Sequence, residues 1–289
     1  MRNDLLKAAV VFGLVLGLAM VLPAHAQDGA LERIKKTGTL TIGYRETARP
    51  FSFKNEGGQP DGYSVDLCRR IAAAVEKSLG LPRLNLRFVP VTAATRVEAV
   101  MKGTVDIECG STTMSLSRQE QVDFTHMTFV DGGSLLVVDG LGIRTIPNLA
   151  GKRVAVIPST TTAPALEGAL LRARTQATIV PVKTHEEGLA ALESGAADAY
   201  ASDRTILIGV GRRASKPEKY ALADELFSYE PHGFMIRRGD SAFRFVANRT
   251  LSTLYRSGDV AEIYGKWFGD MGTPGTALRA MYLLHSFPD

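Results

Sequence analysis

The spacing of apolar residues changes repeatedly between helical and strand periods, which is typical of an α/β protein. In the first half of the chain it predicts helices at 31–36, after Asp61-Gly-Tyr-Ser64 and from Thr92 to Gly103, and strands at 40–44, 84–89 and 105–109. In the second half it predicts strands at 154–157, 179–182 and 197–201, helices opened by Ser159–Thr162 and by a capping box at Thr184-x-x-Glu187, and C-terminal helices within 243–268 and up to Leu284.

One arrangement of glycine, strand and polar residues occurs twice. Ser111 follows Gly103 by eight residues, and Asp203 follows Gly195 by eight residues, with a predicted buried strand between each pair. Polar side chains just beyond the carboxyl ends of strands lie where open α/β sheets bind ligands. We therefore expect two lobes that face one small polar ligand.

The first 26 residues predict a secretory signal peptide. Arg2 and Lys7 are followed by a continuous apolar segment from Ala8 to Leu22 and by Ala24-His25-Ala26, which suits cleavage after Ala26. This apolar segment of roughly 15 residues is shorter than the ~20 that a membrane-spanning helix needs. We expect an exported protein.

The remaining chain is expected to form one lobe from residues 27–135, a second lobe from 136–232, and a return to the first lobe over 233–289. The apolar strands predicted at 134–138 and 233–236 are the expected connections between the lobes. No low-complexity linker separates these parts.

Charge and cysteine content narrow the function classes. The formal net charge is +4, but the basic residues are dispersed, which does not favour a nucleic-acid-binding protein. The two cysteines, Cys68 and Cys109, lie in apolar segments. A disulfide is one interpretation for an exported protein, and unpaired buried thiols are the one we favour. Two distant cysteines without a suitably spaced histidine predict no zinc site, and we expect no metal and no cofactor.

Two arginines suggest an acidic ligand. Arg45 directly follows the first predicted strand, and Arg96 lies in the first turns of the helix after Thr92. Both are expected to face the same crevice as Ser111. Guanidinium groups bind carboxylates through paired hydrogen bonds, so this pair favours a dicarboxylate.

The second lobe supplies complementary groups. Asp203 could hold an ammonium group together with Thr113 of the first lobe, or could cap the following helix. Thr160 and Thr161 lie at a helix N-terminus, which suits a carboxylate. His185 could donate a further hydrogen bond to an anion. Each side chain also has a purely structural interpretation.

Catalysis is not favoured by these residues. The sequence lacks a G-x-S-x-G nucleophile motif, and no pair of carboxylates flanks the expected crevice. Glu108, the best candidate base, lies in an apolar strand, where a paired or outward-facing carboxylate is expected. Binding without chemistry is the stronger interpretation.

The chain resembles the periplasmic amino-acid-binding proteins of ABC importers, particularly the glutamate/aspartate-binding type. The segments that carry the resemblance are Gly43-Tyr-Arg-Glu46, Pro50-Phe-Ser-Phe53, Gly62-Tyr-Ser-x-Asp66, Arg96, Gly103–Thr113, Arg118, Val122-Asp-Phe124 and Lys266-Trp-Phe268. The resemblance implies a type II two-lobed fold, in which each lobe is a mixed sheet flanked by helices and two strands form the hinge. It also implies a monomer in the periplasm that delivers its ligand to an inner-membrane permease.

The resemblance assigns the individual contacts. It implies that Arg96, Ser111 and Thr161 hold the α-carboxylate, that Asp203 and Thr113 hold the α-ammonium, and that Arg45 pairs with the side-chain carboxylate near His185. One position departs from the type, because Ala93 replaces a serine just after Thr92. The missing hydrogen bond could be supplied by Thr92 or Thr95, so the choice between glutamate, aspartate and a related acid stays open. A periplasmic enzyme resembling a dehydratase and a sensory binding protein are the alternatives.

Overall fold

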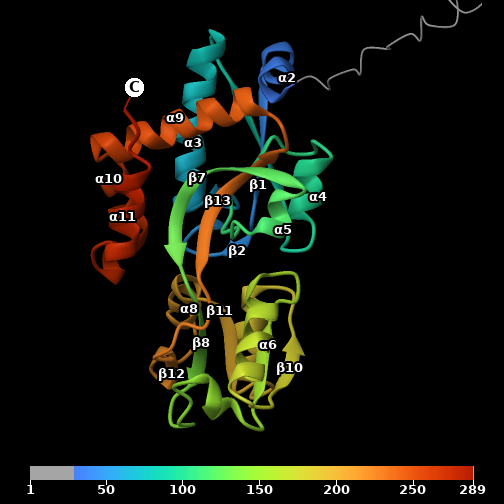
Figure 1. Cartoon of the computed structure of the whole chain (residues 1–289), viewed down its shortest axis with the longest axis vertical. Coiled ribbons are helices and arrows are strands. Elements are labelled where there is room, and N and C mark those ends of the chain that lie inside the picture. Colours follow the sequence, from blue (N-terminus) through green and yellow to red (C-terminus); the bar gives the residue numbers. More distant parts are fainter. Residues whose placement is uncertain (1–28, 289) are drawn as a thin grey trace, which may run out of the picture.

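The computed structural model describes residues 29–288, which form two lobes arranged end to end (Figure 1). The predicted signal peptide lies outside these residues. Within the described part of the chain, no helix has the length and apolar character needed to cross a membrane.

The first lobe is built on a five-stranded mixed sheet, and the predicted mixed α/β class is correct. Its order is β5 (Asn85–Pro90), β1 (Thr39–Tyr44), β6 (Ile107–Glu108), β13 (Glu230–Arg237) and β7 (Val122–Asp131). β1 is parallel to β5 and β6, whereas β13 is antiparallel to β6 and β7. The helices of this lobe are α2 (Ala30–Thr37), α3 (Tyr63–Leu79), α4 (Arg96–Met101), α5 (Leu116–Gln119), α9 (Ser241–Ser257), α10 (Val260–Phe268) and α11 (Thr276–Leu284).

The second lobe repeats this plan with a sheet in the order β10 (Thr178–Pro181), β9 (Arg153–Val156), β11 (Ala199–Asp203), β8 (Gly133–Val138) and β12 (Tyr220–Leu222). Its helices are α6 (Thr162–Arg172), α7 (His185–Glu193) and α8 (Arg204–Gly211). The strand that contains Pro181 lies at the edge of the sheet, as expected of a residue without a backbone N–H. A small sheet of β2 (Thr47–Ala48), β3 (Ser52–Lys54) and β4 (Pro60–Asp61) belongs to the first lobe and faces the junction.

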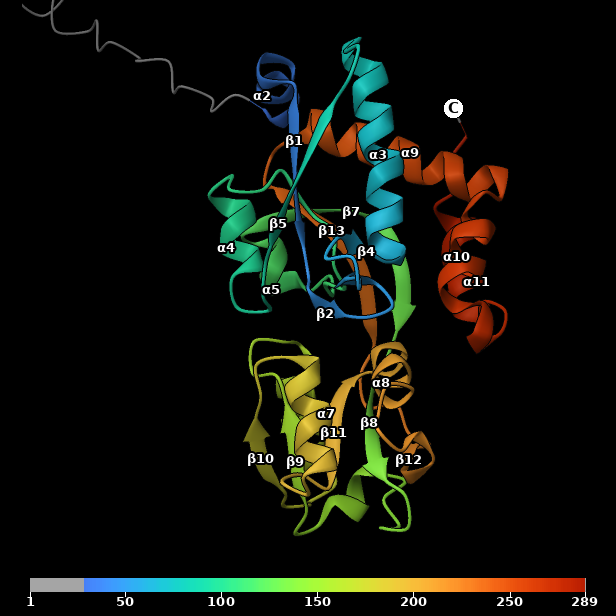
Figure 2. The same ribbon diagram turned by 180° about the vertical axis from the view of Figure 1, so that it is seen from behind.

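The chain passes between the sheets at two neighbouring points, which are visible from both sides (Figures 1 and 2). β7 ends at Asp131 and β8 begins at Gly133, while the return occurs between β12 and Glu230 at the start of β13. The strands predicted as connections, 134–138 and 233–236, lie in β8 and β13, directly beside these crossings. The lobe boundaries at residues 135 and 232 stay a prediction.

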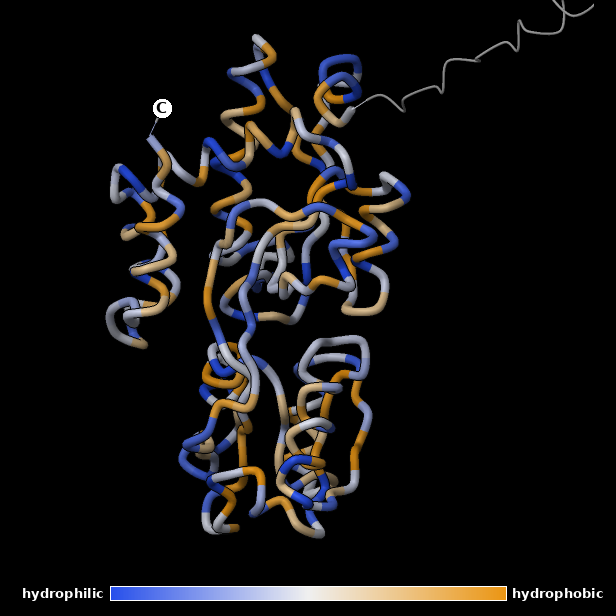
Figure 3. Tube along the Cα trace, viewed as in Figure 1, coloured by the Kyte–Doolittle hydropathy of each residue, from blue (hydrophilic) through white to orange (hydrophobic). Residues whose placement is uncertain are grey.

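Apolar residues fill the interior of each lobe, and hydrophobic strand segments alternate with hydrophilic loops along the chain (Figure 3). In the first lobe, the rings of Phe51, Tyr63, Phe129 and Phe268 pack against one another with centroids 4.8–6.2 Å apart. Burial of such side chains contributes about 1.5–3 kcal/mol each to folding. This core fixes the strands whose ends carry the polar residues.

The predicted helix starts near Thr184 and Thr92 are present, with small shifts in the residues that begin or cap each helix. Thr184 caps α7 by accepting a hydrogen bond from the Glu187 backbone N–H, at 3.1 Å. The Glu187 carboxylate returns to the N–H of Lys183 instead of Thr184, so the predicted capping box is shifted by one residue. α4 begins at Arg96, after a turn in which Thr92 accepts from the Thr95 N–H.

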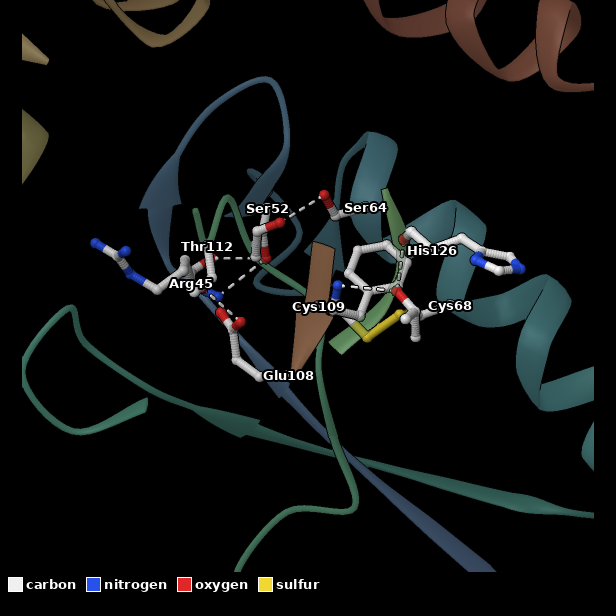
Figure 4. The surroundings of a disulfide bond; sticks show 11 residues. Arg45, Ser52, Ser64, Cys68, Glu108, Cys109, Thr112 and His126 are labelled. Atoms are coloured by element: carbon white, nitrogen blue, oxygen red, sulfur yellow. Dashed lines mark hydrogen bonds between the residues drawn. A yellow bond between two sulfur atoms is a disulfide. The ribbon is translucent and has the colours of Figure 1, made fainter. Parts of the chain in front are cut away.

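The cysteine prediction was wrong. Cys68 of α3 and Cys109, directly after β6, form a disulfide with a Cα–Cα distance of 6.4 Å (Figure 4). Both residues are buried, as predicted, but the fold brings α3 next to the end of β6, where Ser64 of the same helix also contacts Gly110. Burial was therefore no argument against pairing.

Candidate functional site

The eight predicted site residues line one pocket between the lobes. The first lobe contributes Arg45, Arg96, Ser111 and Thr113, and the second contributes Thr160, Thr161, His185 and Asp203. Thr162, Ser202 and Ile206 complete the lining and were not predicted. Each half of the pocket lies at the carboxyl ends of strands of its own sheet, where the sequence pattern placed it.

The two arginines lie side by side in a buried, positively charged half of the pocket. Arg45 follows β1, and its backbone N–H donates to Ser52 Oγ of β3 at 2.9 Å. Burial, followed by the nearby charge of Arg96, lowers the pKa of Arg45 to about 10. Burial also lowers the pKa of Arg96. Both stay protonated at neutral pH, so this half of the pocket favours anionic groups.

Glu108 balances part of this positive charge. Arg96 Nη1 donates to Thr112 Oγ1 at 2.7 Å, and Thr112 donates in turn to Glu108 Oε2 at 2.7 Å. Glu108 is fully buried, and Figure 4 shows it beside Thr112 and Arg45. It is thus a paired carboxylate, one of the two interpretations expected for it.

Gly110 allows this close arrangement. A Cβ at this position would collide with Glu108 Oε1 and would lie 3.0 Å from Arg45 Cγ. The backbone of this segment is held by the disulfide at Cys109 and by Ser64 Oγ, which donates to the Gly110 carbonyl at 2.8 Å. The loop that leads to Ser111 is therefore tied to α3.

His185 presents a neutral ring to the pocket. It is the first residue of α7, and its Nδ1 lies 2.6 Å from the hydroxyl of Tyr200. Burial, and then the charge of Arg45, lowers the pKa of His185 to about 3. The ring of Tyr200 packs so closely on α7 that a Cβ at Gly188 would lie 2.6 Å from it. The neutral imidazole can therefore offer a hydrogen bond without adding a third positive charge.

Asp203 is free for a role in the pocket because its side chain makes no capping hydrogen bond to α8. Its Oδ2 lies 3.1 Å from Nε2 of His232, a buried residue of β13. Burial lowers the pKa of His232, but the bond to Asp203 and the charges of Asp131 and Glu230 outweigh it and raise the pKa. The Asp203 side chain thus contacts a buried histidine of β13 and also lines the pocket.

Sequence reasoning assigned no role to three residues that support the pocket, namely Glu230, His232 and Arg118, although Arg118 is among those that carry the family resemblance. Glu230 accepts hydrogen bonds from Thr113 and Thr161, and Arg118 Nη1 donates to the Thr113 carbonyl at 2.7 Å. Two ionisable residues, two positions apart at the start of an otherwise apolar strand, were the signal for Glu230 and His232. Their partners are distant in sequence, so the pattern alone could not say what they contact.

The hydroxyl groups of Thr92, Thr95 and Thr160 are not directed at a ligand, in contrast to the expectation from the sequence. Thr92 and Thr95 are exposed and lie 3.1 Å apart through their Oγ1 atoms, and neither lines the pocket. Thr160 Oγ1 donates to the Ile157 carbonyl at 2.7 Å. A carboxylate near α6 would therefore depend on backbone N–H groups at its N-terminus.

Residues 40–270 match the family described as bacterial extracellular solute-binding proteins, family 3. The chain belongs to this family. Among similar proteins, an L-glutamate/L-aspartate-binding protein of Pseudomonas aeruginosa is 40% identical over 92% of this chain and 87% of its own length. A glutamate/aspartate import solute-binding protein of Escherichia coli is 33% identical over 90% of this chain and 87% of its own length.

Solved structures of solute-binding proteins share the fold. An ancestral arginine-binding protein bound to glutamine matches with a TM-score of 0.71 and 28% identity, over 80% of this chain and 98% of that one. The ancestral amino-acid-binding protein AncCDT-1, described as a precursor of cyclohexadienyl dehydratase, matches with a TM-score of 0.72 and 27% identity, over 83% and 100%. The two-lobed type II architecture predicted from the resemblance is confirmed.

As a family 3 solute-binding protein, the chain is related by sequence to proteins named for binding. Across residues 29–288, no cluster of three or more histidine, cysteine or acidic side chains could hold a metal ion. The pocket is built from two cations, one carboxylate and several hydroxyl groups. This combination can bind a zwitterion that carries an additional negative charge.

Proposed function

We propose that this solute-binding protein captures an acidic amino acid, L-glutamate or L-aspartate, between its lobes and delivers it to the permease of an ABC transporter. The observation that carries the proposal is one pocket in which two buried arginines of the first lobe face Asp203 of the second. An acidic amino acid has two carboxylates and one ammonium group, which match these three charges. The names of the related binding proteins support the same ligand class.

The contacts follow from the charges. Arg96, with Ser111, holds the α-carboxylate, and Arg45 binds the side-chain carboxylate near the neutral ring of His185. Asp203 and Thr113 bind the ammonium group. Each charged group of the ligand thus replaces water with a charge-assisted hydrogen bond, which is stronger than one between neutral groups.

Closure of the lobes completes the site. The arginines and Asp203 belong to different lobes, so only a ligand that contacts both lobes stabilises the closed arrangement through its differential affinity. We propose that the protein works as a monomer in the periplasm after removal of residues 1–26, and that the permease recognises the closed form.

Binding without catalysis is part of the proposal. The contrasting candidate is a periplasmic dehydratase, since one structural neighbour is described as the precursor of such an enzyme. Recovery of chemically unchanged glutamate and aspartate after prolonged incubation is expected. Conversion of a carboxylated ring substrate by the purified protein would contradict the proposal.

The decisive experiment is calorimetry of the mature protein against all common amino acids. L-Glutamate and L-aspartate are expected to bind at least about tenfold more tightly than glutamine and asparagine, because the amides lack the second carboxylate for Arg45. Equal affinity for acids and amides, or binding of basic amino acids alone, would exclude the acidic ligand class.

A further inference from the structure

Glu230 occupies an unusual place for a carboxylate. It begins β13 at the point where the chain returns to the first lobe, and it pairs in register with Asp131, the last residue of β7. Its side chain is buried, with 1% of its surface exposed. The partners that its oxygens contact within hydrogen-bond distance are hydroxyl groups.

These hydroxyl groups come from both lobes. Thr113 of the first lobe and Thr161 of the second each donate to Glu230 Oε2, at 2.6 Å in both cases. Ser228 of the crossing segment donates to Oε1 at 2.5 Å, and its oxygen accepts from the Gly133 N–H at 3.0 Å. One carboxylate therefore joins the first lobe, the second lobe and both crossings.

The number of protons then determines what the two threonines can offer to a ligand. A hydroxyl group has one proton and two lone pairs, and a carboxylate can only accept. Thr161 Oγ1 also lies 3.1 Å from Thr113 Oγ1, but the contacts with Glu230 are shorter. With both protons directed to Glu230, Thr113 and Thr161 present lone pairs to the pocket that they line.

Lone pairs at these positions favour a donor and disfavour an anion. A ligand ammonium group would find acceptors on Thr113, Thr161 and Asp203, whereas a carboxylate placed against these three side chains would meet lone pairs and the negative charge of Asp203. The Thr161 side chain is then unsuited to the α-carboxylate, in contrast to the role that the resemblance implied for it.

We propose that Glu230 is a positioning residue that directs the protons of Thr113 and Thr161 away from the ligand, and so couples lobe closure to recognition of the ammonium group. The inference rests on the proposed function, because it concerns which part of an acidic amino acid contacts these threonines. Opening of the lobes separates Thr161 from Glu230, while Thr113 stays bridged to His232 of β13. The acceptor set is therefore complete only in the closed form.

The test compares L-glutamate with glutarate, which has the same two carboxylates and no ammonium group. In Glu230→Met, no acceptor remains at the position of Oε2, so the protons of Thr113 and Thr161 can turn toward the pocket. Affinity for L-glutamate is expected to fall about 10- to 100-fold, while affinity for glutarate is unchanged or higher. The measured quantity is the ratio of the two affinities, obtained by competition calorimetry.

The matched control is Glu225→Met, which changes an exposed glutamate of the same crossing segment. Its ratio is expected to stay within about twofold of the wild-type ratio. A folded Glu230→Met protein with an unchanged ratio would overturn the proposal, even if its melting temperature were lower. Thr113→Val removes one of the two acceptors directly and serves as the test if Glu230→Met fails to fold. An unchanged ratio in Thr113→Val would also overturn the proposal. Wild-type protein that binds neither glutamate nor aspartate would instead contradict the proposed function.

Discussion

At the scale of single residues, the pocket separates three charges that an amino-acid ligand would bring together. Arg45 and Arg96 lie in the first lobe, and Asp203 lies across the junction in the second. All three are buried, with 3–6% of their surfaces exposed, so each is partly deprived of water when the lobes are closed. The cost of removing these charges from water makes the pocket sensitive to the loss of any one partner.

The two arginines should therefore respond differently to substitution. Arg96→Met is expected to abolish binding of every amino acid, because all of them carry an α-carboxylate. Arg45→Met is expected to lower affinity for glutamate and aspartate by about 30- to 1000-fold and to affect glutamine and asparagine far less. Calorimetry of both variants with these four ligands measures the difference. Equal losses for acids and amides in Arg45→Met would show that Arg45 does not read the side chain.

Asp203→Asn tests the ammonium contact. The substitution preserves size and removes the charge, and breaking a buried charged pair on one side costs about 3–5 kcal/mol, which corresponds to a loss of at least ~100-fold in affinity. Because the Asp203 side chain does not cap α8, the unliganded variant is expected to fold. Binding is measured by calorimetry and folding by circular dichroism. Unchanged affinity would refute the assigned role.

His185 predicts a specific dependence of stability on pH. Its pKa is about 3 in the folded protein and ~6.5 when unfolded, so the unfolded state alone binds this proton between those values. The contribution of neutral His185 is complete above pH ~6.5 and decreases by about 1.4 kcal/mol per pH unit below it. Urea unfolding of wild-type protein and of His185→Gln at pH 7, 6 and 5 measures this effect. The free energy of unfolding of the wild type, relative to that of the variant, should decrease as the pH falls. A constant difference would show that folding does not shift the pKa of His185.

At the scale of elements, the disulfide links the helix α3 to the loop that carries Ser111. It closes a segment with a sequence separation of 41 residues, and restricting the unfolded chain in this way stabilises a protein by about 2–4 kcal/mol. Ser64, on the same helix, holds the Gly110 carbonyl. α3 thus serves as the support for the anion-binding half of the pocket.

Replacing both cysteines, Cys68→Ala with Cys109→Ala, is expected to lower the free energy of unfolding by about 2–4 kcal/mol. Wild-type protein should show a similar loss in a reducing agent, whereas the double variant should be indifferent to it. Urea unfolding with and without the reducing agent measures both effects. A wild-type curve that does not shift on reduction of the bond would contradict this.

The elements could be predicted from sequence because their signals are local. Gly103 and Gly195 end their helices, Thr184 caps α7, and the strands before Ser111 and Asp203 are apolar. The eight predicted residues meet because strand ends in each sheet converge. What local signals could not supply were partners distant in sequence: Cys68 with Cys109, His232 with Asp203, and Glu230 with Thr113 and Thr161. In each case the sequence shows the residue type, but only the three-dimensional fold determines which residue it contacts.

At the scale of the whole molecule, ligand binding should change shape and stability together. Saturating L-glutamate or L-aspartate is expected to decrease the radius of gyration measured by small-angle scattering, because the open form is less compact. The melting temperature should rise, since the ligand binds only the folded state; an excess of 100 times the Kd adds about 2.7 kcal/mol. Arg96→Met protein with the same ligands is the control. No change in either quantity for both ligands would contradict closure.

The packing of the C-terminal helices has a consequence for this motion. Tyr282 of α11 meets the hydroxyl of Tyr63 at 2.9 Å, and Tyr63 and Tyr255 donate to the carbonyls of Thr128 and Met127 at 2.8 Å. These contacts hold β7 up to a few residues before the crossing, so we expect this strand to stay fixed to the first lobe when the lobes move. Rotation of the second lobe must then come from changes in the few backbone dihedral angles around Gly132 and just before Glu230. The C-terminal helices contribute no residue to the pocket lining, but they thereby determine the axis about which the two lobes rotate.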